Sequence, residues 1–283
     1  MATVKESVIV AAGLRSPCLQ AGSESTEAAV FVHGNPGSGE DWRALVGLVG
    51  DFGRAVAADM PGFGQADKPV AFDYTVLGFA RHLDVQLATL HIERAHLVLH
   101  DFGGPWGLAW AAQHAARVAS VTLFNIGILP GYTWHYLAKI WRTPLIGELF
   151  QLTATRGAFH QLLKHGNPRG LPRAFVDRMF DNYDAGTKRA ILKLYRATDP
   201  SSIADFTQQV IAALNPRDIP ALVIWGERDP YLPSRYAEIQ KQAFPHARII
   251  KLADSGHFPF VDNPEAVAAE VIPFLREQMG RGK

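Results

Sequence analysis

Cysteine and charge are both scarce in this chain of 283 residues. A single cysteine, Cys18, excludes an internal disulfide framework and is typical of proteins from reducing compartments. Only 19% of the residues are charged, and 28 basic residues nearly balance 27 acidic ones. Because binding to nucleic acid needs a concentrated basic face, the composition predicts no nucleic-acid partner.

Targeting segments and cofactor motifs are also missing. The apolar run 8–12 is too short to cross a membrane, and no signal-peptide cleavage site follows it. We therefore expect a strand there, a cytoplasmic protein and no membrane partner. No metal-ligand cluster has a recognisable spacing, and no Gly-x-Gly-x-x-Gly fingerprint follows a strand, so we expect no metal and no other cofactor.

The sequence does contain an alternation of short apolar runs and helix-length segments. The apolar runs predict buried strands of a parallel sheet at 28–32, 55–58, 95–99, 118–124, 220–225 and 247–252. The segments between them predict helices at 41–49, 76–90, 105–114, 234–243 and 264–279. This alternation is typical of an α/β architecture, a mostly parallel twisted sheet with helices on both faces. In such sheets the functional residues lie at the carboxyl ends of the strands.

The stretch 128–216 interrupts this alternation. It has the character of several helices, is rich in aromatic residues, and contains turn breakers at Pro144, Pro168 and Pro172. We expect 128–216 to be a helical cap inserted into a core that consists of 1–127 and 217–283. Most of its aromatic residues are expected to form the interior of the cap rather than to contact a substrate.

The strongest motif is the segment 97–107, Leu-Val-Leu-His-Asp-Phe-Gly-Gly-Pro-Trp-Gly. A strand runs into a tight glycine-rich turn and a helix follows at once, which is the geometry of a nucleophile elbow. A serine usually occupies the central position, but here it is Asp101, and the chain contains no Gly-x-Ser-x-Gly sequence. Asp101 is therefore the candidate nucleophile. The alternative is that Asp101 only caps the following helix.

A second motif, Phe-Val-His-Gly-Asn-Pro-Gly at 31–37, ends an earlier predicted strand. Its glycine allows the backbone to approach a substrate closely, and its proline fixes the turn. Beside the elbow, the backbone N–H groups of Asn35 and Phe102 would form an oxyanion hole. Losing one such donor typically costs about 2.7–4 kcal/mol of transition-state stabilisation.

An acid and a histidine follow the elbow along the chain. Asp229 comes after the predicted strand 220–225, and His257 comes after the last predicted strand. The order nucleophile, acid, base is the one that α/β-hydrolases use. Glu227 and Asp254 compete for the role of the acid, but the place of Asp229 ahead of Pro230 and Pro233 favours Asp229.

These residues together resemble the aspartate-nucleophile branch of the α/β-hydrolase superfamily, which includes haloalkane dehalogenases and epoxide hydrolases. The resemblance covers nearly the whole chain. It rests on His-Gly-Asn-Pro at 33–36, Asp-Met-Pro-Gly-Phe-Gly at 59–64, His-Asp-Phe-Gly-Gly at 100–104, the cap, Gly-Glu-Arg-Asp at 226–229 and Gly-His at 256–257. It implies an α/β-hydrolase fold and a triad of Asp101, His257 and Asp229.

An aspartate nucleophile restricts the reaction. A carboxylate with an ordinary pKa of about 3.9 is charged at neutral pH and needs no base before it attacks. Attack on an ester carbonyl would yield a reactive anhydride, whereas attack on a saturated carbon yields an ordinary alkyl ester. We therefore predict a hydrolase in which Asp101 displaces a leaving group from carbon and a water activated by His257 releases the ester. Asp229 would orient His257 and stabilise its imidazolium form.

Two leaving groups fit this scheme. An epoxide oxygen needs proton donors, which epoxide hydrolases place on two cap tyrosines. The candidates in this cap are Tyr132, Tyr136, Tyr183 and Tyr195. A halide needs N–H donors, and the resemblance to dehalogenases supplies the side chain of Asn35. The residue after the nucleophile is Phe102, where typical dehalogenases carry tryptophan, and phenylalanine has no N–H to donate.

We expect an epoxide hydrolase that acts on a small hydrophobic substrate with water, and a haloalkane dehalogenase is the alternative. Epoxide hydrolases commonly carry an aromatic residue in place of Asn35. Asn125 ends the strand before the cap, where some dehalogenases carry the acid, and its amide leaves that role to Asp229. Less favoured alternatives are an esterase or lactonase that uses Asp101 as a base, and a ligand-binding member of the fold. Nothing in the sequence indicates an oligomeric state.

Overall fold

The computed structural model describes residues 1–281. Its centre is an eight-stranded sheet in the order β1-β2-β4-β3-β5-β6-β7-β8. β1 (Lys5–Ala11) and β2 (Leu14–Ala21) form an antiparallel hairpin, and β2 pairs antiparallel with β4 (Arg54–Ala58). The remaining strands run parallel to β4; they are β3 (Glu27–Val32), β5 (Arg94–His100), β6 (Val118–Phe124), β7 (Ala221–Gly226) and β8 (Arg248–Leu252). The predicted mostly parallel sheet is confirmed.

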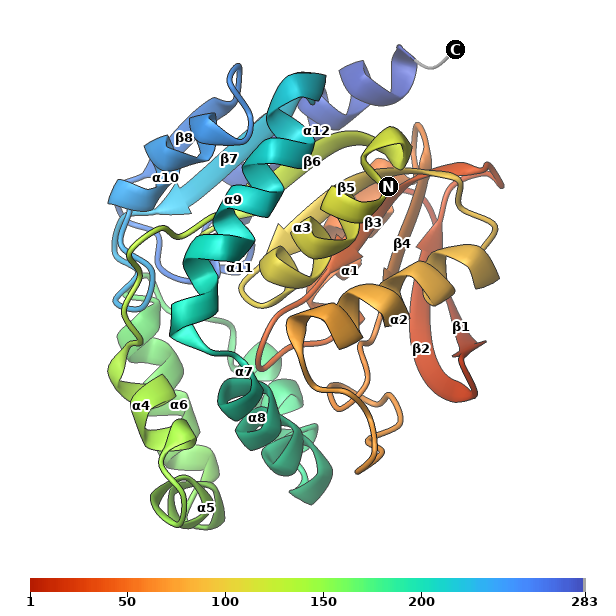
Figure 1. Cartoon of the computed structure of the whole chain (residues 1–283). Coiled ribbons are helices and arrows are strands. Elements are labelled where there is room, and N and C mark those ends of the chain that lie inside the picture. The colour runs from red at the N-terminus through yellow and green to blue at the C-terminus, as the bar shows by residue number, and fades with distance from the viewer. Residues whose placement is uncertain (282–283) are drawn as a thin grey trace.

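Helices cover both faces of this sheet (Figure 1). On one face α2 (Val76–Thr89) packs on α3 (Gly103–Gln113), and α3 packs on α9 (Ile203–Leu214). On the other face α1 (Arg43–Val49) packs on α12 (Pro264–Gly280). Two short helices follow the last two strands; they are α10 (Arg235–Ile239) and α11 (Pro259–Asp262). The predicted arrangement of helices on both faces is therefore confirmed.

Continuous burial explains why the central strands are apolar along their whole length. Every residue of β6 and β7 is buried, because helices lie above and below them. On one face, the two helices α2 and α3 are joined by Trp106 of α3, whose ring stacks on Phe79 of α2 at a centroid distance of 4.0 Å. Because β5, β6 and β7 pair in parallel, the polar residues that follow them come together at one edge of the sheet.

Five helices gather at one end of the molecule in Figure 1, and we call them the cap helices. They are α4 (Tyr136–Arg142), α5 (Ile146–Leu152), α6 (Arg156–Gly166), α7 (Arg173–Asp181) and α8 (Ala185–Ala197). The division of the chain at 128 and 216 stays a prediction. Within that stretch, α9 lies along α3 in the helix layer of the core. None of the helices within residues 1–281 is long and apolar enough to span a membrane.

Candidate active site

Asp101 lies in a strained turn between β5 and α3. Its φ of +48° is in the left-handed region, which costs a residue with a side chain about 1–3 kcal/mol. The N–H of Gly104 closes the turn by donating to the carbonyl oxygen of Asp101 at 2.9 Å. The neighbouring loop approaches so closely that a Cβ on Gly34 would lie 2.3 Å from the Cβ of Asp101. The turn and the loop together hold the carboxylate at the carboxyl edge of the sheet.

The two predicted oxyanion donors flank this carboxylate. The backbone N–H of Asn35 donates to Oδ1 of Asp101 at 2.7 Å. Phe102 stands at the N-terminal end of α3, where backbone N–H groups have no acceptor within the helix. The N–H of Asn35 thus faces the carboxylate, and the helix dipole favours negative charge near the N–H of Phe102.

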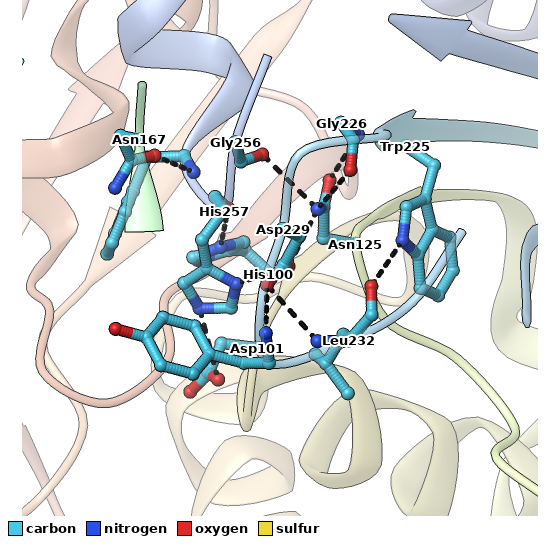
Figure 2. A network of polar contacts seen from close by, with 12 residues as sticks. His100, Asp101, Asn125, Asn167, Trp225, Gly226, Asp229, Leu232, Gly256 and His257 are labelled. Atoms are coloured by element: carbon cyan, nitrogen blue, oxygen red, sulfur yellow. Dashed lines mark hydrogen bonds and ion pairs between the residues drawn. The ribbon is translucent and has the colours of Figure 1, made fainter. Parts of the chain in front are cut away.

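His257 lies between two carboxylates, as Figure 2 shows. Its Nε2 is 3.4 Å from Oδ2 of Asp101, and its Nδ1 is 2.7 Å from Oδ2 of Asp229. Asp229 is buried, and its Oδ1 accepts hydrogen bonds from the backbone N–H groups of Tyr231 and Leu232. The competing acids Glu227 and Asp254 are exposed. The structure thus brings together the three residues that the sequence singled out as a triad.

Asn125 braces the acid from the other side. Its Nδ2 donates to Oδ2 of Asp229 at 2.8 Å and to the carbonyl of Gly256 at 3.3 Å, and its Oδ1 accepts from the N–H of Gly226 at 2.9 Å. One side chain therefore connects the loop of Asp229 to the loop of His257. The sequence had indicated only that Asn125 could not be the acid. Its place at the end of β6 was the available signal for this bracing role.

The cap helices hold the backbone of the histidine loop. The N–H of His257 donates to the carbonyl of Gly166 at 2.9 Å, and the N–H of Phe258 donates to Oδ1 of the buried Asn167 at 2.7 Å. The approach is close, because a Cβ on Gly256 would lie 2.1 Å from the carbonyl oxygen of Gly166. The sequence pattern indicated only a turn at Asn167 and Pro168 and gave no sign of this contact.

A protein-family model described as the alpha/beta hydrolase fold matches residues 29–264. The chain belongs to this family. The match covers the elbow, the acid and the histidine of the geometry described above. The predicted fold and the prediction of a hydrolase are therefore confirmed.

Three similar proteins carry three different activities in their names. A cis-3-alkyl-4-alkyloxetan-2-one decarboxylase of Xanthomonas campestris is 28% identical, over 93% of both chains. The structure of a haloalkane dehalogenase from Agrobacterium tumefaciens is 26% identical, with a TM-score of 0.83 over 97% of both chains. An epoxide hydrolase structure has a TM-score of 0.81 at 15% identity, over 96% of this chain and 99% of that one. The predicted resemblance to haloalkane dehalogenases is confirmed, the likeness to the epoxide hydrolase is one of fold, and the decarboxylase was not predicted.

Charge pairing sets the protonation states in this hydrolase. Burial alone would raise the pKa of Asp101, but the hydrogen bond and the charge of His257 outweigh it and lower that pKa from 3.8 to about 2. Burial would likewise lower the pKa of His257, but the negative charges of Asp229 and Asp101 raise it from 6.5 to about 10. At neutral pH the site therefore holds an ionised Asp101 and a protonated His257.

The four candidate tyrosines differ in where their hydroxyls lie. Tyr195 of α8 is buried, and its hydroxyl is 3.4 Å from Nδ2 of Asn35. The hydroxyl of Tyr183 donates to the side chain of Gln151, and that of Tyr132 donates to the carbonyl of Tyr231 at 3.3 Å. Tyr136 is 47% exposed. The Tyr195 hydroxyl is thus within hydrogen-bond distance of Asn35, the residue of one predicted oxyanion donor. The structure does not bring Tyr136 to Asp101.

Asp101 lines two cavities of this hydrolase. The larger, of about 350 Å³, is mostly apolar, and Phe102, Ile126, Leu129 and Trp134 line it. The smaller, of about 50 Å³, contains Asn35, Trp141, Tyr183, Tyr231 and His257 in its wall. Within residues 1–281, no group of three His, Cys, Asp or Glu side chains is placed to hold a metal ion. The site can therefore accept an apolar molecule against Asp101, with His257 on the far side of the carboxylate.

Proposed function

We propose that this hydrolase opens small hydrophobic epoxides with water through an alkyl ester on Asp101. The observation that carries the proposal is the position of the Tyr195 hydroxyl, which is 3.4 Å from Nδ2 of Asn35. The backbone N–H of the same Asn35 binds the carboxylate of Asp101. One residue, Asn35, thus contacts both the cap hydroxyl and the carboxylate that would attack carbon.

In the first step an oxygen of Asp101 attacks one ring carbon and the carbon–oxygen bond of the epoxide breaks. Asp101 is ready to attack, because its pKa is about 2. The oxygen that leaves carbon becomes an alkoxide and takes a proton from Tyr195. Burial, together with the nearby charge of Asp101, raises the pKa of Tyr195 well above 10, so its hydroxyl keeps its proton until the alkoxide forms.

In the second step the charge of the site changes. Once Asp101 is an ester, one of the two negative charges facing His257 has gone, so the pKa of His257 falls. His257 gives its proton to the deprotonated oxygen of Tyr195, and the neutral imidazole then accepts a proton from water. The resulting hydroxide attacks the ester carbonyl, and the N–H groups of Asn35 and Phe102 stabilise the oxyanion. The tetrahedral intermediate then collapses and its bond to the alcohol oxygen breaks. The departing alkoxide takes the proton of the added hydroxyl group, so Asp101 is again a carboxylate and the diol is released.

The two cavities support separate positions for the substrate and the attacking water. His257 lines only the smaller of the two cavities, whereas Asp101 lines both. A cavity of about 50 Å³ accommodates a few water molecules, since one water needs roughly 10–15 Å³ by this measure. The apolar substrate would occupy the larger cavity and the attacking water the smaller.

Three substrates test the proposal: styrene oxide, 1-bromobutane and a cis-3,4-dialkyl oxetan-2-one. The expected result is diol from styrene oxide. A single turnover in oxygen-18 water should leave the heavy oxygen in Asp101 first, because water attacks the ester and not the epoxide. His257→Gln should accumulate the alkyl ester, visible as an added mass on the intact protein. Carbon dioxide from the oxetanone without any diol would replace the proposal with the activity named for the Xanthomonas relative.

A haloalkane dehalogenase is the second candidate, and one observation favours it. The amide of Asn35 and the indole of Trp141 line the smaller cavity together with Asp101. The indole N–H of Trp141 is buried and has no hydrogen-bond partner among the described residues. Two N–H donors could therefore serve a halide in place of the donor that Phe102 lacks. Bromide release from 1-bromobutane without diol from styrene oxide would establish this candidate instead.

A further inference from the structure

His135 lies where the two cavities meet. It is the residue at the start of α4, and it lines both the larger and the smaller cavity, as Asp101 does. Its ring is surrounded by aromatic side chains, with the rings of Tyr231 and Tyr195 at centroid distances of 5.1 and 6.1 Å. The sequence analysis assigned it no role, because a histidine in the middle of an aromatic stretch carries no local signal.

The hydrogen bond that His135 makes fixes its tautomer. Its Nδ1 faces the backbone N–H of Ala138 at 3.2 Å and caps the N-terminus of α4. A backbone N–H can only donate, so Nδ1 must accept, and the proton of the neutral ring is on Nε2. Burial lowers the pKa of His135 from 6.5 to about 4, despite the opposing charge of Asp101, which keeps the ring neutral near pH 7.

The Nε2–H of His135 is therefore a donor that the protein itself does not use. No hydrogen bond within residues 1–281 involves Nε2. The ring is held in place by its cap on α4 and by the tyrosines around it. A donor with a fixed direction, next to a cavity and without a protein acceptor, is suited to an acceptor atom of the substrate.

We propose that His135 is a further catalytic residue, whose Nε2–H donates a hydrogen bond to the epoxide oxygen beside the hydroxyl of Tyr195. This inference rests on the proposed function. As the Asp101 oxygen bonds to carbon and the carbon–oxygen bond breaks, the oxygen accepts two hydrogen bonds and takes its proton from Tyr195. His135 keeps its proton, because losing it would produce an imidazolate.

The contribution of His135 as a helix cap must be separated from its contribution as a donor. His135→Asn serves this purpose, because asparagine is among the best N-cap residues but its short side chain does not extend as far as Nε2. His135→Gln restores an N–H donor at about the reach of Nε2. Thr155→Ala is the matched control, since Thr155 caps α6 in the same way and lines neither cavity.

The test is a single-turnover measurement with styrene oxide that resolves ester formation from ester hydrolysis. We expect His135→Asn to slow ester formation on the order of 10²-fold, the effect of losing one preorganised donor, and to leave the hydrolysis rate within about twofold. His135→Gln should recover part of the loss, and Thr155→Ala should change neither rate.

Two results would overturn the role of His135. One is ester formation at the wild-type rate in His135→Asn, and the other is an equal loss in both steps, which would indicate a packing role in the cap. Failure of the proposed function looks different. In that case wild-type protein and His257→Gln would form neither diol nor an ester adduct from any epoxide, and the inference about His135 would fall with it.

Discussion

The carboxylate of Asp229 at the carboxyl edge of the sheet and the two tryptophans that line the cavities differ in how completely their polar groups are paired. At the edge, Asp229 accepts hydrogen bonds from two backbone N–H groups, from Asn125 and from His257. In the cap and the segment that leads into it, the buried indole N–H groups of Trp134 and Trp141 have no partner among the described residues, and these side chains line the cavities. A fully paired network is rigid and costly to alter, whereas unpaired donors are available to a ligand. Under the proposed function, we therefore expect changes at Asp229 to affect every substrate and changes in the cap to affect substrates according to their leaving group.

Removing the nucleophile should have the largest effect on activity. Asp101→Asn replaces the carboxylate with a neutral amide, and we expect kcat for every substrate to fall on the order of 10⁴–10⁶-fold. Asparagine tolerates the φ of +48° at this position, so the fold should be retained. Thermal unfolding by circular dichroism is the control. Residual turnover above about 1% of wild type in a folded variant would exclude an alkyl ester on Asp101.

A change in the cap should be selective for the leaving group. Tyr195→Phe removes the hydroxyl that would protonate the alkoxide, and we expect ester formation from styrene oxide to slow on the order of 10²–10³-fold. Ester hydrolysis uses Tyr195 only to take the proton of His257, which the alkoxide can accept instead in the variant, so this step should slow much less. Tyr136→Phe is the matched control, because that hydroxyl lies on an exposed residue. Equal losses in ester formation and ester hydrolysis would contradict a specific role of the Tyr195 hydroxyl in protonating the alkoxide.

A change at the edge should instead affect stability. Asn125→Gly removes the brace between the acid loop and the histidine loop, and we expect a loss of about 1–3 kcal/mol in the free energy of unfolding, measured by urea denaturation. Asn125 has a φ of +49°, which glycine adopts without strain. Asp218→Gly is the control, since Asp218 has a φ of +48° on an exposed side chain. A similar change in both variants would show that the backbone, not the side chain, carries the effect.

The smallest effect is expected from pH. Asp101 is ionised above a pKa of about 2, and His257 stays protonated below a pKa of about 10. His135 titrates at about 4, and the pKa of Tyr195 is raised well above 10. No group used in ester formation titrates between these limits, so the rate of that step should change less than about threefold from about pH 5.5 to 8.5. A steep dependence in stopped-flow measurements would contradict the assignment of Asp101 as an ionised nucleophile.

The stability that the ion pair contributes should depend on pH in a defined direction. The pKa of His257 is raised on folding from 6.5 to about 10, so its contribution is complete below about pH 6.5 and is lost as the pH rises through about 10. His257→Gln should abolish this alkaline loss, and unfolding curves at pH 7 and pH 10 measure it. An identical loss in both proteins would assign the effect to other groups.

Local patterns were sufficient to predict the edge of the sheet. Asp101 and Asp229 each follow a strand that is apolar because both faces are covered, and His257 follows the edge strand β8, which is only partly buried. The hairpin strand β2 was missed, because Arg15 and Pro17 interrupt its apolar character. Parallel strands bring their ends together whatever the details of packing, which is why the sequence could indicate that Asp101, Asp229 and His257 lie close together.

The cap could not be predicted to the same extent. The hydroxyl of Tyr183 donates a hydrogen bond to Gln151, which is 32 residues away in sequence. Such a contact depends on how α5 packs against α8 and its neighbours, which local sequence patterns do not show. The sequence did not show which of the four tyrosine hydroxyls points towards the sheet. In the structure the hydroxyl of Tyr195 contacts the side chain of Asn35. His135 was missed for the same reason, since its tautomer depends on a helix cap and its position on contacts with distant rings.

The hydrogen bonds that Gly166 and Asn167 accept from the histidine loop have an evolutionary consequence. A cap exchanged for that of another enzyme would leave two main-chain amides of the loop without acceptors, and the general base would lose its anchor. New specificities in this lineage are therefore expected to arise by substitutions within the existing cap. Replacement of the whole cap would have to preserve Gly166 and Asn167 at the end of α6.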